Sequence, residues 1–181
     1  MKKTIALTTV LLCSLAGFAQ QSSNSSQTVS MGVSSTIELT FSGSTTATGA
    51  TVNLNFNTVN DYANGVASSD QELKVTSNRN FTIAVKTSSA TFSYSGSTSP
   101  APSMPVGILG LMIASNSTGG TIVSPFSASA YNSLSNSNQM LLNTCTAGNA
   151  KLFAVKYKAT PDFAYPAGTY TVDVLYTATQ L

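Results

Sequence analysis

Few side chains in this sequence could carry out acid–base, nucleophilic or metal chemistry. The 181 residues include no His, and Cys13 and Cys145 are the only cysteines. Without His, neither a Ser-His-Asp triad nor a Cys-His pair can form, and zinc loses its commonest ligand. No Gly-rich loop of the kind that cradles phosphate between a strand and a helix occurs. These absences predict a protein that is not an enzyme and that binds no metal or cofactor.

Carboxylates are the remaining candidates for catalysis, and the chain has six of them: Glu38, Asp61, Asp70, Glu72, Asp162 and Asp173. Asp70 and Glu72 would share one face of an extended strand, where mutual repulsion could raise the pKa of one of them. Glycoside hydrolysis uses such a pair. The same charges fit a solvated strand edge that resists aggregation, and this is the interpretation we favour.

The segment NDYANG, residues 60–65, contains oxygen ligands that could hold calcium. Asp61 lies there between Asn60 and Asn64. Their spacing does not fit an EF-hand loop. Asn, Asp and Gly are also the residues that turns prefer, so we predict an ordinary turn.

Carbohydrate binding would need exposed aromatic side chains, and the sequence has no Trp. Most of its Tyr and Phe residues fall on apolar strand faces, where they are expected in the core. Tyr62 and Tyr131 lie in polar segments and are the candidate ligand contacts, although packing within loops is the interpretation we favour for both.

The N-terminus has the pattern of a secretory signal peptide. Lys2 and Lys3 precede an apolar stretch from Ile5 to Ala16, and Gly17-Phe18-Ala19 fits a cleavage site. Cleavage after Ala19 predicts a signal peptide at 1–19 and no membrane span afterwards. The product would be secreted to the cell surface or the extracellular space, or kept in the periplasm.

Removal of residues 1–19 would leave six basic and six acidic residues, because two of the eight Lys and Arg are Lys2 and Lys3. A net charge of zero without a basic face argues against nucleic acid as a partner. Cys145 would then be alone, so no intramolecular disulfide could form. It fits a small buried apolar residue, or an exposed thiol that pairs between chains.

The elements that must position these residues are β-strands. Apolar and polar residues alternate in short runs between segments rich in Gly, Ser, Asn and Pro, which is typical of strands with one buried face. The clearest runs are 29–41, 52–56, 73–75, 81–85, 92–94, 153–157 and 170–178. We predict about eight to ten strands and no helix, arranged as a single antiparallel immunoglobulin-like Greek-key β-sandwich. Residues 20–34 would be a flexible arm, and residues 35–181 the sandwich.

Three segments resemble a known family. AGTYTVDVLYTATQL, residues 167–181, is similar to the C-terminus of spore-coat-protein-U-like modules, the secreted pilins of archaic chaperone–usher pili. LKVTSNRNFTIAVKT, residues 73–87, is similar to their middle strand pair, and VNLNFNTVNDYANG, residues 52–65, to the strand and loop before it. Those pilins often carry a disulfide in their first half; in this chain Ser77 stands in the middle strand pair.

This resemblance implies a sandwich that lacks its last strand. In such pilins the N-terminal arm of the next subunit fills the gap, by donor-strand complementation. The donor-strand anchors would be Val29, Met31 and Val33, and the acceptor residues would be Tyr170, Val172, Val174 and Tyr176. The partners would be further copies of the chain or other pilus subunits, a periplasmic chaperone and an outer-membrane usher. The alternative is a complete sandwich that acts as a monomeric secreted module and binds a glycan or another surface protein.

Overall fold

The computed structural model describes residues 24–43 and 47–181, and the chain divides into two compact units, Met1–Val33 and Ser34–Leu181. In the first unit, residues 24–33 form neither helix nor strand. The signal peptide predicted at 1–19 lies outside the described residues, as do residues 20–23 of the predicted arm. The second unit begins one residue before the predicted sandwich.

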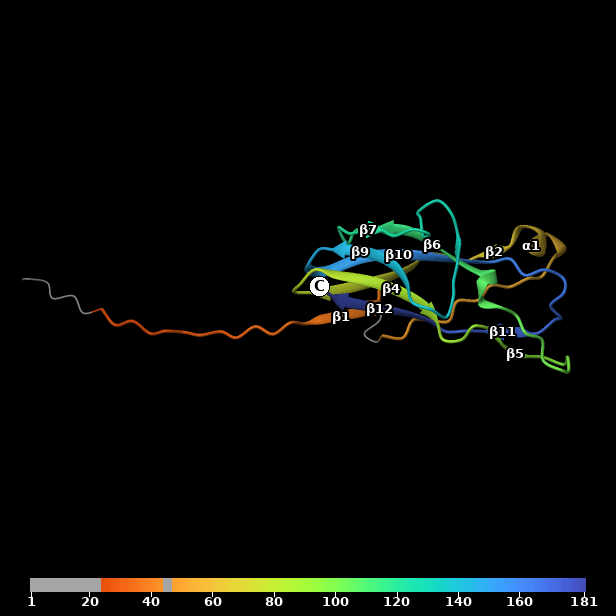
Figure 1. The fold of residues 1–181 in the computed structure, drawn as a ribbon, viewed down its shortest axis with the longest axis horizontal. Helices are drawn as coiled ribbons and strands as arrows, with labels where there is room; N and C mark the ends of the chain where they lie inside the picture. Colours follow the sequence, from red (N-terminus) through yellow and green to blue (C-terminus); the bar gives the residue numbers. More distant parts are fainter. Residues whose placement is uncertain (1–23, 44–46) are drawn as a thin grey trace, which may run out of the picture. The chain divides into compact units, whose positions relative to one another are not determined.

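The second unit is an antiparallel β-sandwich (Figure 1), which confirms the predicted fold class. One sheet has the order β1 (Ile37–Phe41), β3 (Gln71–Ser77), β10 (Gly148–Ala159), β6 (Leu109–Asn116) and β8 (Asn132–Ser133), with β2 (Val66–Ala67) also paired to β10. The other has the order β12 (Val174–Gln180), β4 (Phe81–Thr87), β9 (Gln139–Cys145) and β7 (Thr121–Ile122). A separate pair joins β11 (Thr169–Thr171) to β5 (Ser93–Ser95).

Part of the strand order matches the immunoglobulin pattern, whereas β9, which lies between β6 and β10 in the chain and pairs with β4, has no counterpart in that pattern. β1, β3, β10 and β6 take the places of strands A, B, E and D, and β4 and β12 those of C and F. In a complete immunoglobulin domain, strand G would pair with the outer edge of F. Among the described strands, β12 pairs with β4 alone.

The core follows from alternation on the central strands. On β3 and β4 every second side chain points inward, and Val75, Phe81 and Ile83 are fully buried. Between the two strands, the Ser77 hydroxyl donates to the Arg79 carbonyl oxygen at 2.7 Å and closes the turn over residues 77–80. Cys145 is also fully buried, as expected for a small apolar residue, and burial raises the pKa of its thiol.

The prediction of no helix was wrong, because α1 (Val59–Asn64) forms where a turn was expected; a short 3₁₀ turn, η1 (Val106–Ile108), also occurs. Thr58 caps α1: its hydroxyl accepts from the Asp61 N–H at 3.3 Å, and the Asp61 carboxylate accepts from the Thr58 N–H at 2.8 Å. Hydrogen bonds from the backbone of Asn57 and Thr58 lower the pKa of Asp61. Asp61 therefore acts as a helix cap.

Two predicted strands differ from the structure. The final segment is two strands, because β11 pairs with β5 whereas β12 pairs with β4. The run from Val52 to Phe56 is not a strand, although Val52, Leu54 and Phe56 pack on the core. None of the helices that the structure describes has the length and hydropathy needed to cross a membrane.

Candidate functional site

The strongest candidate site is the edge where the two sheets meet at β1 and β12. β1 is the last strand of one sheet and β12 the last strand of the other. Figure 1 shows them side by side, β1 in orange and β12 in dark blue. Gln180 Nε2 donates to the Thr36 carbonyl oxygen at 2.8 Å, and the Phe41 and Tyr176 rings meet edge to face with centroids 6.3 Å apart.

Half of the β12 backbone points away from its sheet. The Leu181 N–H donates to the Asn80 carbonyl at 2.8 Å, and the Ser88 N–H donates to the Asp173 carbonyl at 2.9 Å. In an antiparallel ladder without a bulge, every second residue bonds the neighbouring strand and the intervening residues face outward. The N–H and C=O groups of Val174, Tyr176 and Ala178 therefore face away from β4, and none has a backbone partner among the described residues.

The β1 backbone also has groups that face away from its sheet, but they belong to odd-numbered residues, whereas those of β12 belong to even-numbered ones. The Ser42 N–H donates to the Glu72 carbonyl at 2.8 Å, and the Asn78 N–H donates to the Thr36 carbonyl at 3.2 Å. Even-numbered residues of β1 thus bond β3, and the backbone groups of Ile37, Leu39 and Phe41 face outward. We call these three residues, with Val174, Tyr176 and Ala178, the free edges.

The side chains of the free edges are less buried than those of the central strands. All six pack against the core yet keep part of their surface exposed, whereas Val75 on β3 and Ile83 on β4 are completely covered. Central inner-face residues are covered from both sides, whereas edge residues lack one neighbour. The free edges therefore combine unpaired backbone with partly exposed apolar surface, as edge strands that accept another strand do.

A second stretch of unpaired extended backbone is residues 49–56. Val52, Leu54 and Phe56 point to the core and the intervening residues are exposed, which is the pattern of a strand. No backbone group of residues 49–56 has a hydrogen-bond partner within the described part of the chain. The alternation correctly predicted which side chains are buried, but no neighbouring strand is present to complete a ladder.

A hydrogen bond between two phenols lies behind the free edges. The hydroxyls of Tyr157 on β10 and Tyr176 on β12 are 2.7 Å apart. Burial raises the pKa of Tyr157 to about 12 and places that of Tyr176 well above its usual value. Both phenols are neutral at physiological pH, so neither brings a charge to the inner side of the free edges.

The structure separates the four predicted acceptor residues. Val174 and Tyr176 lie on β12 at the free edges, and Val172 lies just before it and packs on the core. Tyr170 is on β11, where its ring contacts Tyr94 at 5.0 Å and its hydroxyl donates to the Pro166 carbonyl at 2.8 Å.

The predicted donor anchors lie in the first unit. The exposed fractions of their side chains are 83% for Val29, 84% for Met31 and 74% for Val33. Few other large apolar side chains among the described residues are as exposed; Val59 at 74% and Phe163 at 69% are the nearest. Three such residues at every second position present one apolar face if the segment becomes extended.

The two predicted ligand contacts are partly covered by neighbours. Tyr62 on α1 stacks on Phe163, with ring centroids 4.7 Å apart and planes inclined by 20°, and also touches Phe56. The Tyr131 ring lies 5.9 Å from the Lys158 ammonium nitrogen. Packing explains both rings, and Phe163 is the only aromatic side chain among the described residues that is largely exposed.

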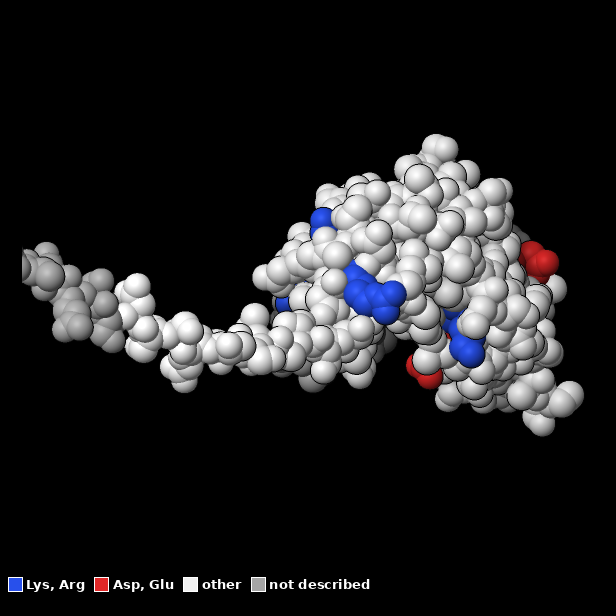
Figure 2. Space-filling view, turned by 60° about the vertical axis from the view of Figure 1, so that its left-hand side comes forward, with Lys and Arg blue, Asp and Glu red and all other residues white. Residues whose placement is uncertain are grey.

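The two carboxylates considered for catalysis, Asp70 and Glu72, are both exposed. Asp70 pairs with Lys156 at 3.0 Å on the surface, and Glu72 is an exposed residue of β3. Within the described residues, no three acidic or Cys side chains come close enough to hold a metal ion. Figure 2 shows small separate groups of charged residues on a face that is otherwise neither basic nor acidic.

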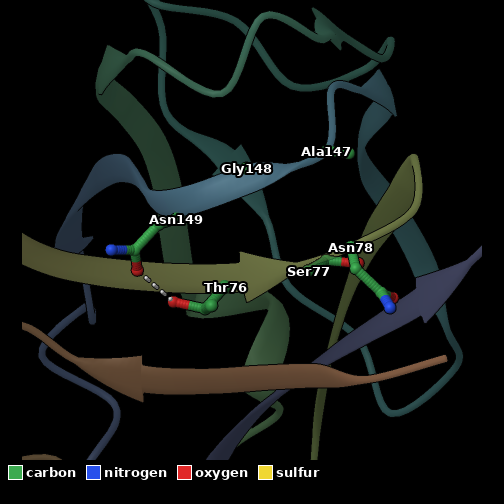
Figure 3. A pocket seen from close by; sticks show the side chains of 6 residues that line it. All are labelled: Thr76, Ser77, Asn78, Ala147, Gly148 and Asn149. Atoms are coloured by element: carbon green, nitrogen blue, oxygen red, sulfur yellow. Dashed lines mark hydrogen bonds between the residues drawn. The ribbon is translucent and has the colours of Figure 1, made fainter. Parts of the chain in front are cut away.

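A hollow of about 460 Å³ lies beside the end of β3, where the β3–β10 ladder shifts register. Figure 3 shows its lining from Thr76 to Asn78 on one side and from Ala147 to Asn149 on the other, with the Thr76 hydroxyl bonded to Asn149 Oδ1 at 3.3 Å. Its lining side chains are neutral, and their hydroxyl and amide groups can form hydrogen bonds.

Comparison with known proteins identifies no relative: no family model and no curated protein matches the chain. The free edges and the residues around them are therefore the features from which a function can be inferred.

Proposed function

We propose that this chain is a non-enzymatic structural subunit of the pilus or fimbria type, which assembles when the N-terminal arm of one copy pairs with the free edges of another. The observation that carries the proposal is the juxtaposition of β1 and β12. Both strands end their sheets, and both have apolar side chains that are partly exposed. The outward-facing backbone of both lacks a backbone partner among the residues that the structure describes.

An added strand would supply both the backbone partners and the apolar cover that the free edges lack. Its backbone would bond the outward groups of Val174, Tyr176 and Ala178, and its apolar side chains would cover the exposed part of the inner face. Val29, Met31 and Val33 supply three such side chains at strand spacing. Full burial of each would contribute about 1.5–3 kcal/mol. The sum is enough for a durable junction between subunits.

The same free edges create a need for protection before assembly. Unpaired strand edges with apolar surface are prone to aggregate. A periplasmic chaperone that lends a strand, and an outer-membrane usher that replaces it with the next subunit, would meet that need. The predicted signal peptide would deliver the chain to this route, and the assembled product would lie on the cell surface.

The test is a charge scan of the arm in the mature chain, residues 20–181. The triple variant Val29→Asp, Met31→Asp, Val33→Asp places three charges on the apolar parity. Its control, Thr28→Asp, Ser30→Asp, Gly32→Asp, places the same charges on the opposite parity. We expect multimers in the unchanged protein and the control, and monomers in the first variant, as measured by light scattering after gel filtration and by negative-stain microscopy. Multimers of equal size in all three would refute the proposal.

A second candidate function is a monomeric module that binds a glycan or a surface protein. The observation in its favour is the exposed Phe163 ring, stacked on Tyr62, because exposed aromatic rings can stack on sugar rings. A glycan array with the unchanged protein and with Phe163→Ala, Tyr62→Ala and Tyr131→Ala tests it. Binding that is lost in the first two variants and kept in the third would support this alternative.

A further inference from the structure

Two side-chain amides hold the backbone at the start of β1. Asn78 Nδ2 donates to the Ser34 carbonyl at 2.7 Å, and the Thr36 N–H donates to Asn78 Oδ1 at 2.9 Å. Gln180 Nε2 donates to the Thr36 carbonyl at 2.8 Å and to Asn78 Oδ1 at 3.2 Å. We call this set of contacts the amide clamp.

The Asn78 amide takes the place of a further residue of β3. β3 ends at Ser77, and the chain turns away toward β4. The Asn78 N–H still bonds the Thr36 carbonyl, and its side chain then offers one donor and one acceptor to residues 34 and 36, as an opposing strand would. Figure 3 shows Asn78 at the end of β3 with its side chain directed away from Asn149.

Residues 34–36 are also where the arm would have to turn if it completed its own domain. Hairpin loops of two or three residues are the commonest. A loop at 34–36 would bring Val33, Met31 and Val29 along the outward edge of β1 in the same molecule. The short connection makes this self-insertion the local competitor of assembly, since an intramolecular strand has a high effective concentration.

We propose that the amide clamp prevents self-insertion and so commits the arm to a second copy of this chain. The inference rests on the function proposed above. Such a loop requires the Ser34 carbonyl and the Thr36 N–H and carbonyl to leave their present partners. The clamp occupies all three groups, so the extended path of residues 34–36 is favoured over the hairpin. Gln180 comes from β12 itself, so the clamp forms only when the last strand is in place.

Disulfide trapping with introduced cysteines distinguishes an arm that pairs with β12 of its own molecule from an arm that pairs with β12 of a second copy. Ser30→Cys lies on the arm's non-anchor parity and is paired, in turn, with Leu175→Cys, Thr177→Cys or Thr179→Cys on the outer face of β12. Neighbouring strands place such residues on one side of the sheet, within disulfide reach when the register agrees. Cys145 is fully buried and stays unchanged. Refolding a mixture of isotope-labelled and unlabelled full mature chains identifies links between copies by mass spectrometry.

The trap is applied to the unchanged clamp, to Asn78→Ala with Gln180→Ala, and to a control, Asn132→Ala with Gln139→Ala. The control also removes one Asn and one Gln whose side-chain amides donate to backbone carbonyls, at 3.2 Å to Ala130 and 3.1 Å to Ser133. Asn78→Asp, which keeps the acceptor and loses the donor, serves if the double variant fails to fold.

The expected result is links between copies for the unchanged clamp and the control, and a rise of about tenfold in the ratio of intrachain to interchain links without the clamp. An unchanged ratio would overturn the clamp and leave the proposed function standing. Intrachain links already dominant in the unchanged protein would overturn the clamp and argue for a self-completed monomer. No link at any of the three β12 positions in any protein would overturn the proposed function and the clamp with it.

Discussion

The phenol oxygens of Tyr157 and Tyr176 lie 2.7 Å apart and join β10 of one sheet to β12 of the other. The Tyr176 ring also meets Phe41 and Phe153 edge to face, each with centroids 6.3 Å apart. β12 has a neighbouring strand on one side only, so this hydrogen bond and these ring contacts hold its unpaired side against the core. The phenol pair thereby positions the free edge of β12.

The first prediction concerns the free energy of unfolding of phenylalanine variants at these two positions. Tyr157→Phe and Tyr176→Phe should each cost about 1–3 kcal/mol, because each leaves the other hydroxyl buried without its partner. The double variant removes both hydroxyls and should be destabilised by clearly less than the sum of the two single variants. Urea titrations followed by circular dichroism measure all four proteins. Strictly additive costs would contradict the coupling.

The second prediction follows from the raised pKa values of the same pair. The folded protein holds the phenolic protons to higher pH than the unfolded chain, whose tyrosines titrate near 10. The contribution is therefore complete below pH 10 and is lost as pH rises through the folded pKa, about 12 for Tyr157. The free energy of unfolding should stay level up to about pH 10 and then fall by up to ~1.4 kcal/mol per pH unit for each phenol. Urea titrations between pH 8 and pH 11.5 test this, and the fall should be much smaller in the double phenylalanine variant.

Alternation in the sequence predicted the buried faces well and the strand pairing poorly. Val52, Leu54 and Phe56 alternate as clearly as Phe81, Ile83 and Val85, yet only the second set belongs to a strand. Alternation records which side of an extended chain is buried, whereas a ladder also needs a neighbour at the right distance. The sequence did not predict the break between β11 and β12 for the same reason. Tyr170 and Tyr176 continue one alternating pattern, but they pair with different strands.

Two hydrogen-bonded features of the structure differ in how far the sequence could predict them. The cap of α1 had a local signal, since Thr58 and Asp61 stand three residues apart as in a capping box, and the turn-forming residues around them outweighed it. The amide clamp had none. Gln180 and Thr36 are 144 residues apart in the chain, and nothing near either residue indicates that the fold brings them together.

The third prediction concerns the packing at Gly120, next to β7. A Cβ at this position would lie 2.6 Å from the Asn143 carbonyl oxygen and 2.6 Å from Cys145 Sγ, and both belong to β9. The backbone of a central strand cannot yield easily, so Gly120→Ala should cost about 1–3 kcal/mol of the free energy of unfolding. Gly107→Ala is the control, because no atom lies within 4 Å of its Cβ. Equal unfolding midpoints for the two variants would contradict the expected clash.

The fourth prediction concerns hydrogen exchange along β12, where parity gives an internal control. In monomeric protein the amides of Leu175 and Thr177 bond β4 and should exchange slowly, whereas those of Tyr176 and Ala178 face outward and should exchange quickly. Pairing of an arm with β12 should slow the outward set by more than about a hundredfold, which corresponds to roughly 3 kcal/mol of opening free energy.

The measurement is NMR of amides after exchange of the assembled protein and dissociation under quenched conditions. In the variant with Asp at Val29, Met31 and Val33, the outward-facing amides should exchange quickly at every protein concentration. If the assembled protein protects Tyr176 and Ala178 no better than the monomer does, β12 is not where subunits join. Protection that appears instead at residues 52–56 would move the junction to that segment, because its amides also lack partners among the described residues.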